Sequence, residues 1–331
     1  MARMLSLQKD KNDDTQLRHG YERHEGTDVG DITANGTYMF GQVCPYFFTR
    51  EGNTMFLDGM YRGSTCFLIG GGPSLLKEDY LKLHNPGILT FGMNNSSKLI
   101  RPNMWSSVDD PSRFIYSTWI DPKIMKFIPQ AAFTKPLWKS TFVDGKQMWE
   151  EASIKVGDCP NVVGFRRNEK FQPHRFLTED TINWGCHKKY GGCRSVMLSS
   201  LRIMFILGIR RVFLVGVDLK MDTEHKYSFN EGRTKGAIKN NNSTYKRMLT
   251  EYFPALKPEF DKWGFEVYCC NKESDVCKTF PHVSFEDAIK TASGELGDVD
   301  KEETEGMYLK LEEKRKRGDW ENCAKATEAI K

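Results

Sequence analysis

Short apolar runs alternate with segments of helical spacing from about Thr65 to Ile289. The runs read TCFLIG, GILTFGMN, RRVFLVGVD and FEVYCCN, and each ends in a glycine or a polar residue. Strands that alternate with helices predict an α/β fold, in which a mostly parallel sheet carries helices on both faces. In such sheets ligands bind at the carboxyl ends of the strands.

The clearest helical pattern runs from Ser195 to Leu207. Its apolar positions recur at helical intervals, at Met197, Leu198, Leu201, Met204, Phe205 and Gly208. This spacing predicts a helix that packs one apolar stripe against the core.

Changes in composition divide the chain into three parts. Residues 1–38 are polar and predict a flexible or irregular arm. Residues 39–290 contain the alternating pattern and predict one domain, which the resemblance described below identifies as Rossmann-like, nucleotide-binding and catalytic. Residues 291–331 are rich in charge and predict a helical extension, whose charges form a solvated helix face or a contact in a homo-oligomer.

Composition excludes several classes of protein. Apolar residues make up 39% of the chain, which excludes wholesale disorder, and no run approaches the roughly 18 apolar residues of a membrane span. The start of the chain lacks the apolar core of a secretory signal, so we expect a cytoplasmic protein without a membrane span. Nine cysteines without a C-x2-C pair predict reduced thiols, and a net charge of +4 is too small to indicate nucleic-acid binding by itself.

The stretch FLIGGGPSLL contains the most distinctive turn in the sequence. Gly70, Gly71 and Gly72 end an apolar run, and glycines let a ligand approach the backbone closely. Pro73 and Ser74 suit the start of a helix, whose free N–H groups attract phosphate. The turn therefore predicts a nucleotide site, and a plain strand-to-helix turn remains the alternative.

Carboxylates end two other predicted strands. Asp218 closes RRVFLVGVD, where it faces a ligand or stabilises a turn. Asp109 and Asp110 end MWSSVDD and would suit Mg²⁺ bound to a di- or triphosphate. The alternative for Asp110 is a cap on the helix that begins at Pro111.

Several motifs recur in a fixed order: GGGPSLL, FGMNNS, VDDPSRF, GCRSVMLSSLRIMFILGIRRVFLVGVD, KYSF, KNNNSTYKR and FEVYCCNKES. Over about residues 64 to 290 this arrangement resembles a Rossmann-like superfamily. That superfamily contains the family 42 sialyltransferases, the motility-associated-factor flagellin glycosyltransferases and the 6-hydroxymethylpterin pyrophosphokinases. Similar proteins are encoded by bacteriophages, in which case the expected location is the host cytoplasm.

The resemblance implies roles for particular residues. The glycine turn, with Asn94 or Asn95 at the end of the next strand, would contact the nucleotide of a CMP-sugar. Arg194 and Ser195 would contribute at the start of the long helix, which favours an anion. Gly216 matches the glycine of the family's G-x-D.

The expected phosphate and proton-transfer groups depart from the family pattern. The family places two tyrosines on the leaving phosphate. Tyr227 is similar to the second of these tyrosines, whereas Lys220 stands near the position of the first. Tyr245 is a further phosphate-binding candidate. The family's catalytic histidine is absent, because Lys246 or Arg247 takes its place.

Two residues remain candidates for the catalytic base. They are His225, whose alternative is an exposed loop histidine, and Asp218.

Three hypotheses follow from these observations. The first is a glycosyltransferase that uses a nucleotide-activated sugar as donor and an unidentified hydroxyl acceptor. The second is a Mg²⁺-dependent phosphotransferase of the pyrophosphokinase type. The third is a non-catalytic protein that keeps the nucleotide-binding fold. A nucleic-acid acceptor is a further alternative, suggested by four basic residues, Lys235, Lys239, Lys246 and Arg247.

Overall fold

The computed structural model describes residues 4–9, 17–21, 46–143, 146–187, 192–222, 227–229, 231 and 234–294. The chain divides into two compact units, Met1–Ala292 and Ser293–Lys331. The elements described below belong to the first unit, apart from the end of α5. The predicted boundaries at 38 and 290 remain predictions. Within the predicted arm, β1 (Met4–Lys9) and β2 (Leu17–Tyr21) pair as antiparallel strands, which the sequence reasoning did not anticipate.

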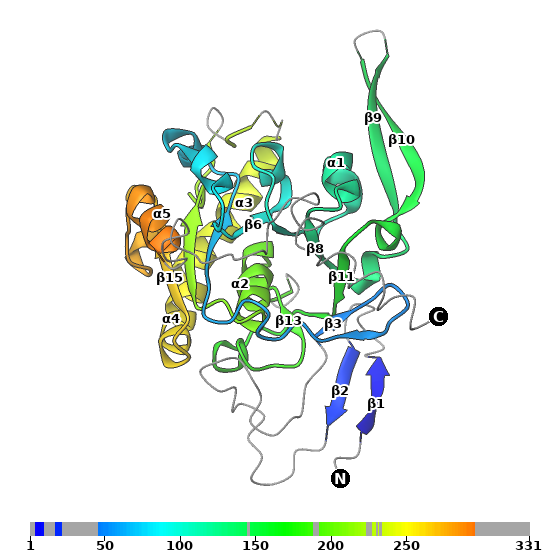
Figure 1. Cartoon of the computed structure of the whole chain (residues 1–331), viewed down its shortest axis with the longest axis horizontal. Coiled ribbons are helices and arrows are strands. Elements are labelled where there is room, and N and C mark those ends of the chain that lie inside the picture. Colours follow the sequence, from blue (N-terminus) through cyan, green and yellow to red (C-terminus); the bar gives the residue numbers. More distant parts are fainter. Residues whose placement is uncertain are drawn as a thin grey trace, which may run out of the picture. The chain divides into compact units, whose positions relative to one another are not determined.

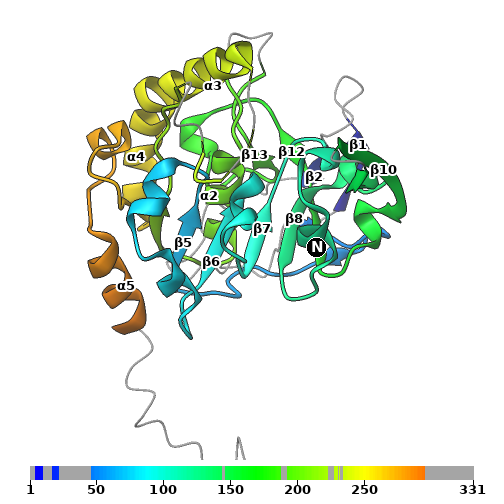
Figure 2. The same ribbon diagram turned by 90° about the horizontal axis from the view of Figure 1, so that it is seen from above.

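The described part contains a mixed sheet of nine strands, which confirms the predicted α/β class. Seven strands are parallel, and β3 and β4 add an antiparallel edge. In spatial order the strands are β15 (Glu266–Cys269), β14 (Arg211–Val215), β5 (Thr65–Ile69), β6 (Thr90–Met93), β7 (Met104–Ser106), β8 (Met125–Pro129), β11 (Val162–Phe165), β3 (Phe47–Phe48) and β4 (Thr54–Met55). Figure 2 shows β5 to β8 side by side.

Helices cover both faces of this sheet, as predicted. They are α1 (Tyr116–Ile120), α2 (Val196–Ile206), α3 (Lys235–Arg247), α4 (Phe253–Lys262) and α5 (Phe285–Gly294). Cys66 and Leu68 of β5 join a core with residues of α2 and α4, whereas Phe67 and Ile69 join a second core with residues of α5 (Figure 1). Because both faces are buried, β5 is an uninterrupted apolar run rather than an alternating one.

Helix α2 confirms the predicted helix, but its burial is more complete than a single stripe. Every residue from Val196 to Ile206 is buried, including the fully buried Arg202. The sheet covers one side, and the chain at residues 59–63 hydrogen-bonds to the end of the helix, since Gly59 N donates to Ile206 O. The Arg202 guanidinium also lies 4.9 Å from the ring centre of Tyr46.

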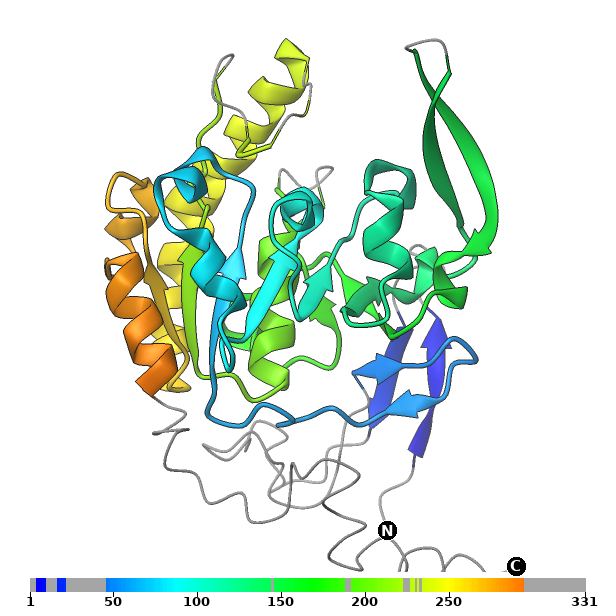
Figure 3. The ribbon, with the colours of Figure 1, turned by 45° about the horizontal axis from the view of Figure 1, so that its top comes forward.

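Besides β1 and β2, two further pairs of described strands lie outside the main sheet. Strand β9 (Pro136–Val143) pairs with β10 (Lys146–Lys155) in an antiparallel hairpin that extends away from the sheet (Figures 1 and 3). Strand β12 (Arg167–Asn168) runs parallel to β13 (Ile182–Asn183), just before α2 in the chain. The hairpin β9–β10 was not predicted from the sequence.

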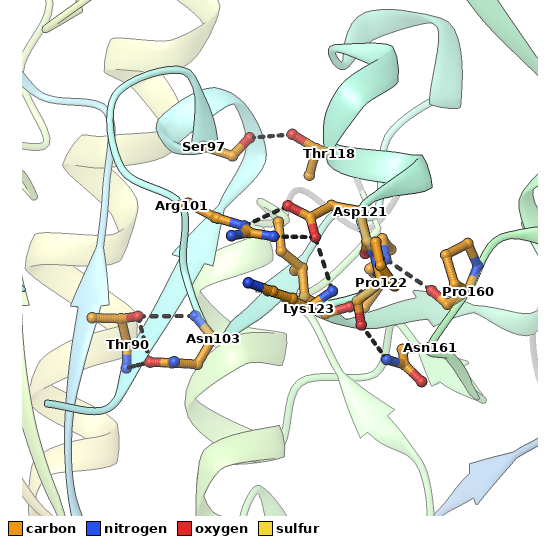
Figure 4. Close-up of polar contacts among 12 residues, drawn as sticks. Thr90, Ser97, Arg101, Asn103, Thr118, Asp121, Pro122, Lys123, Pro160 and Asn161 are labelled. Atoms are coloured by element: carbon orange, nitrogen blue, oxygen red, sulfur yellow. Dashed lines mark hydrogen bonds and ion pairs between the residues drawn. The ribbon is translucent and has the colours of Figure 1, made fainter. Parts of the chain in front are cut away.

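The amino ends of β6, β7 and β8 are fixed by hydrogen bonds. Thr90 and Asn103 bond reciprocally, through Thr90 N and Oγ1 to Asn103 Oδ1 and through Asn103 N to Thr90 Oγ1 (Figure 4). Lys126 is fully buried, and its ammonium donates to the carbonyl oxygens of Asp121, Ile124 and Pro160 at 2.6 to 3.0 Å. Burial lowers the pKa of Lys126 to about 8.

Candidate functional site

A cavity of about 380 Å³ opens at the carboxyl ends of β5, β6 and β14. Strand β6 lies on one side of β5 and β14 lies on the other. The chain therefore leaves β5 toward one side of the sheet and later returns to its other side, which makes β5 the switch point of the topology. Ligands of α/β proteins bind at such a switch point. The start of α2 and one side of α3 complete the lining.

The glycine turn after β5 is shaped first by its contact with β14. A Cβ on Gly72 would lie 2.7 Å from Gly216 O, and a Cβ on Gly70 would lie closer still to that oxygen. Gly216 itself has φ of 64°, a conformation that favours glycine. These three glycines are therefore required by the crossing of two chain segments, whereas Gly71 faces an aromatic pair described below.

Asp218 clamps the glycine turn to the sheet. Its carboxylate accepts hydrogen bonds from the backbone N of Ser74 at 3.0 Å, from the Ser74 hydroxyl, and from Asn271 Nδ2 at 2.9 Å. The N–H at Ser74 that we expected to attract phosphate is thus already used, and a negative charge stands beside it. Pro73 and Ser74 do not line the cavity, although Gly70, Gly71 and Gly72 do. The catalytic role of Asp218 stays a prediction, beside this positioning role.

Asn94 and Asn95 follow β6 and line the cavity, as the sequence predicted. Asn94 has φ of 50°, and its backbone oxygen accepts a hydrogen bond from Trp105 Nε1 at 2.7 Å. Asn95 is 6% exposed, and its Nδ2 donates to Arg113 O and to Glu231 Oε2. Within the described residues, the buried Oδ1 atoms of both asparagines have no hydrogen-bond partner. Buried polar atoms are rarely left in this state.

The start of α2 forms a second polar part of the lining. Ser195 caps the helix, since its hydroxyl accepts from Met197 N at 3.2 Å. The first turn of this 11-residue helix contains no acidic residue. Arg194 precedes the cap and pairs with Glu169 at 2.9 Å. The positive end of the helix dipole therefore meets the cavity beside a guanidinium, which favours an anion.

Trp184 also lines the cavity and was not identified from the sequence. Guanidinium groups lie over its ring, at 4.0 Å for Arg167 and 4.6 Å for Arg194. Its Nε1 is buried and lacks a hydrogen-bond partner among the described residues. Trp184 directly follows the short strand β13 and precedes the Arg194–Ser195 pair in the chain, and this position is the signal that could have indicated it.

Tyr227 and Phe229 form an aromatic wall over the glycine turn. Their rings stack with centres 5.1 Å apart and planes 5° apart. Ser228 N donates to Gly71 O at 2.9 Å, which fixes the segment in place. A Cβ on Gly71 would lie only 3.1 Å from the Phe229 ring, so glycine allows this close packing. His225 lies outside the described residues.

Helix α3 covers another side of the cavity. Lys220 and Tyr245, both predicted phosphate ligands, line the cavity together with Asn241. Asn242 fixes the loop after β14, because its side chain accepts from Met221 N at 3.0 Å and donates to Met221 O at 2.6 Å. An amide side chain of the asparagine-rich stretch thus holds the loop after β14 in place.

Glu231 is a cavity carboxylate that the sequence reasoning missed. Its Oε2 accepts from Asn95 Nδ2 at 2.7 Å and from Lys98 Nζ at 3.2 Å. Glu231 and Asp218 both line the cavity, but Asp218 also holds the backbone turn.

The predicted metal pair is divided between two places. Asp109 lines the cavity and pairs with Arg113 at 2.8 Å. Asp110 confirms the capping alternative, since it accepts from Ser112 N and begins the turn Pro111–Arg113. Lys135, 2.9 Å away, holds the pKa of Asp110 below its usual value. The two carboxylates do not converge on a Mg²⁺ position, and no cluster of three metal-ligating side chains occurs in the described ranges.

Two broader expectations concern the surface. In the part of the chain that the structure describes, no helix combines the length and apolar character needed to cross a membrane. The basic residues proposed for a nucleic acid lie on α3, where Arg247 pairs with Glu251 at 2.8 Å. Nucleic-acid binding and homo-oligomer formation stay predictions.

Comparison with known proteins gives limited information. No protein-family model matches the sequence, and no curated protein matches it. Among solved structures, the chain is similar to the MAf glycosyltransferase from Magnetospirillum magneticum AMB-1, at 10% sequence identity and a TM-score of 0.35. The similarity covers 71% of this chain and 37% of that protein, so the chain spans well under half of the length of its match. A similarity of this size assigns neither a family nor an activity.

Proposed function

We propose that this protein is a glycosyltransferase, which moves a glycosyl group from a nucleotide-activated sugar of the CMP-sugar type to a hydroxyl acceptor. The observation that carries the proposal is a group of three cavity-lining residues, each with a buried polar atom that has no described partner: Asn94 Oδ1, Asn95 Oδ1 and Trp184 Nε1. In this proposal the two acceptors and the one donor turn to the polar edge of a nucleobase when the ligand binds.

The start of α2 supports a place for the phosphate. An anion there would meet the positive end of the helix dipole, with Arg194 beside it. The start of the turn at Ser74 is unsuitable, because Asp218 already accepts its N–H. In this proposal the glycine turn therefore forms a wall, and α2 holds the charge.

The proposed reaction needs one group to take a proton. The bond between the anomeric carbon and the phosphate oxygen breaks, and the nucleotide leaves with the bonding electrons. The acceptor oxygen bonds to the anomeric carbon and loses its proton to a base. We assign this base to Glu231, which Asn95 and Lys98 hold in the cavity, whereas Asp218 is engaged in the turn. His225 and Tyr227 stay predictions.

The two other hypotheses have less support. A Mg²⁺-dependent phosphotransferase would need a metal position, and Asp109 and Asp110 do not form one together. A non-catalytic nucleotide-binding protein would keep the same cavity but would not need a base.

A thermal-shift experiment on the full chain tests the proposal. The monophosphates and diphosphates of cytidine, uridine, adenosine and guanosine are compared, each with and without Mg²⁺. A ligand at about 100 times its Kd stabilises the native state by roughly 2.7 kcal/mol. We expect a Mg²⁺-independent rise in Tm with a cytidine or uridine nucleotide. A rise with adenosine diphosphate that needs Mg²⁺ would favour phosphotransfer, and no rise with any nucleotide would refute the proposal.

A further inference from the structure

A second hollow lies next to the cavity, at the base of the hairpin β9–β10. Its lining consists of Asp110, Ser112, Lys135, Pro136, Trp138 and Trp149. Asp109 lines the main cavity and Asp110 lines this hollow, so consecutive residues face the two spaces.

Two tryptophans form the apolar part of the hollow. In the hairpin, Trp138 lies opposite Glu151 and Trp149 lies opposite Ser140. Side chains alternate between the two faces of a strand, so both tryptophans lie on one face as diagonal neighbours. Trp149 is 52% exposed.

The packing of the hairpin does not require these tryptophans. Leu137 is fully buried, and its neighbour Trp138 lies on the other face of β9. The core thus takes the face that contains Leu137, and Trp138 and Trp149 remain on the second face. An indole that stays half exposed has a large apolar surface available for a ligand.

The polar part of the hollow is electrically balanced. Lys135 Nζ lies 2.9 Å from Asp110 Oδ2, and the Ser112 hydroxyl donates to Asp110 Oδ1 at 2.8 Å. Among the described residues of the lining Lys135 is the one cation, and this pairing neutralises it. A nucleic acid would need uncompensated positive charge, which the lining does not offer. A neutral ligand with apolar faces and hydroxyl edges fits better.

We infer that this hollow binds a carbohydrate, whose ring faces pack on Trp138 and Trp149 and whose hydroxyls bond to Asp110 and Ser112. That this carbohydrate is the acceptor rests on the proposed function. Carbohydrate binding itself does not depend on it.

The test is a glycan array that carries neutral and charged oligosaccharides, probed with the full chain and without nucleotide. We expect the wild type to bind at least one group of glycans. Trp149→Ala should weaken that binding at least tenfold, and Trp149→Phe should restore part of it. Met148→Ala is the matched control, because Met148 is 54% exposed and precedes Trp149 on the opposite face of the strand. This control should bind as the wild type does.

Three results would overturn the inference. They are no glycan binding by the wild type, an equal loss in Met148→Ala, and a change from dimer to monomer in Trp149→Ala by light scattering without a change in glycan binding. The last result would assign the tryptophans to a contact between copies. Circular dichroism confirms that each variant is folded. The nucleotide-induced rise in Tm should persist in Trp149→Ala, so failure of the nucleotide experiment with intact glycan binding would refute only the proposed transfer.

Discussion

At the amino end of β6, Thr90 exchanges hydrogen bonds with Asn103, whereas at the carboxyl end the Oδ1 atoms of Asn94 and Asn95 lack described partners. The same contrast holds for cations. Lys126 at the amino end of β8 donates to three carbonyl oxygens, and Arg194 at the cavity makes one ion pair at an exposed fraction of 29%. The protein itself thus satisfies Thr90, Asn103 and Lys126 at the amino ends, whereas Asn94 and Asn95 at a carboxyl end each have an acceptor without a described partner.

The difference separates structural polar groups from binding groups. A buried polar atom without a partner costs free energy, and at the cavity we infer that a ligand supplies the missing bonds. We infer stability from the satisfied edge and recognition from the unsatisfied one. Substitutions at the two edges should therefore affect different measurements.

The largest effect is expected at Lys126. Lys126→Met fills a similar volume but leaves three carbonyl oxygens, one buried and two part-buried, without their donor. The free energy of unfolding should fall by roughly 3 to 5 kcal/mol, because each such group costs about 1 to 3 kcal/mol. Urea denaturation measures this loss. Lys123→Met, at an exposed position of the same turn, should change it by less than about 0.5 kcal/mol. Equal effects of the two substitutions would contradict the contrast.

Glu179 has a buried oxygen without a described partner, although this residue is not among those that line the cavity. It accepts from Asn168 Nδ2 through Oε2, its Oε1 lacks a described partner, and burial raises its pKa to about 8. The folded protein therefore binds this proton more tightly than the unfolded chain, and stability falls as pH rises from about 4.5 to 8.

This pH dependence can be measured against Glu179→Gln. From pH 5 to 8 the wild type should lose roughly 2 to 3 kcal/mol relative to the variant, within the limit of about 1.4 kcal/mol per pH unit. Urea denaturation across this range gives the difference. Parallel curves for the two proteins would show that the carboxyl group is ionised throughout.

Asp218 combines the features of a structural group and of a binding group, because it holds the turn and also lines the cavity. Asp218→Ala removes three hydrogen bonds, two from Ser74 and one from Asn271, and should lower the free energy of unfolding by roughly 2 kcal/mol. Asp218→Asn should lose about half of this, since an amide oxygen still accepts. A double-mutant cycle with Ser74→Ala should show coupling, because the two side chains are bonded. A stable Asp218→Ala protein that binds nucleotide but lacks activity would instead make Asp218 the base.

Much of the fold could be predicted from the sequence. The apolar runs and the 195–207 pattern located β5, β6, β14, β15 and α2 but not β8, because burial on both sides of a sheet imposes such runs. The hairpin β9–β10 was missed, although an Asp-Gly pair, common in two-residue turns, stands at 144–145. Its strands, PLWKSTFV and KQMWEEASIK, show no regular alternation of apolar and polar residues, so the period of a strand was not visible.

The site was less accessible to sequence reasoning. Adjacency to strand ends located the glycine turn and Asp218, since the carboxyl ends of parallel strands meet at one edge. The family resemblance indicated Asn94, Asn95 and Ser195. Trp184 and Glu231 could not be found in this way, because loops bring them to the cavity and neither follows a predicted strand. The phosphate role of Ser74 stays a prediction, beside the hydrogen bond that its N–H donates to Asp218, 144 residues away.

The most direct test of the central claim is a calorimetric titration of the wild type and Trp184→Phe with CMP and UMP. The substitution keeps an aromatic ring beside Arg167 and Arg194 but removes Nε1, the buried donor without a described partner. The free energy of unfolding should stay within about 1 kcal/mol of the wild type, whereas Kd should rise about tenfold, the equivalent of one hydrogen bond. Identical titrations of the two proteins, or a variant that loses stability without any change in affinity, would contradict the claim that this edge of the sheet is reserved for a nucleotide.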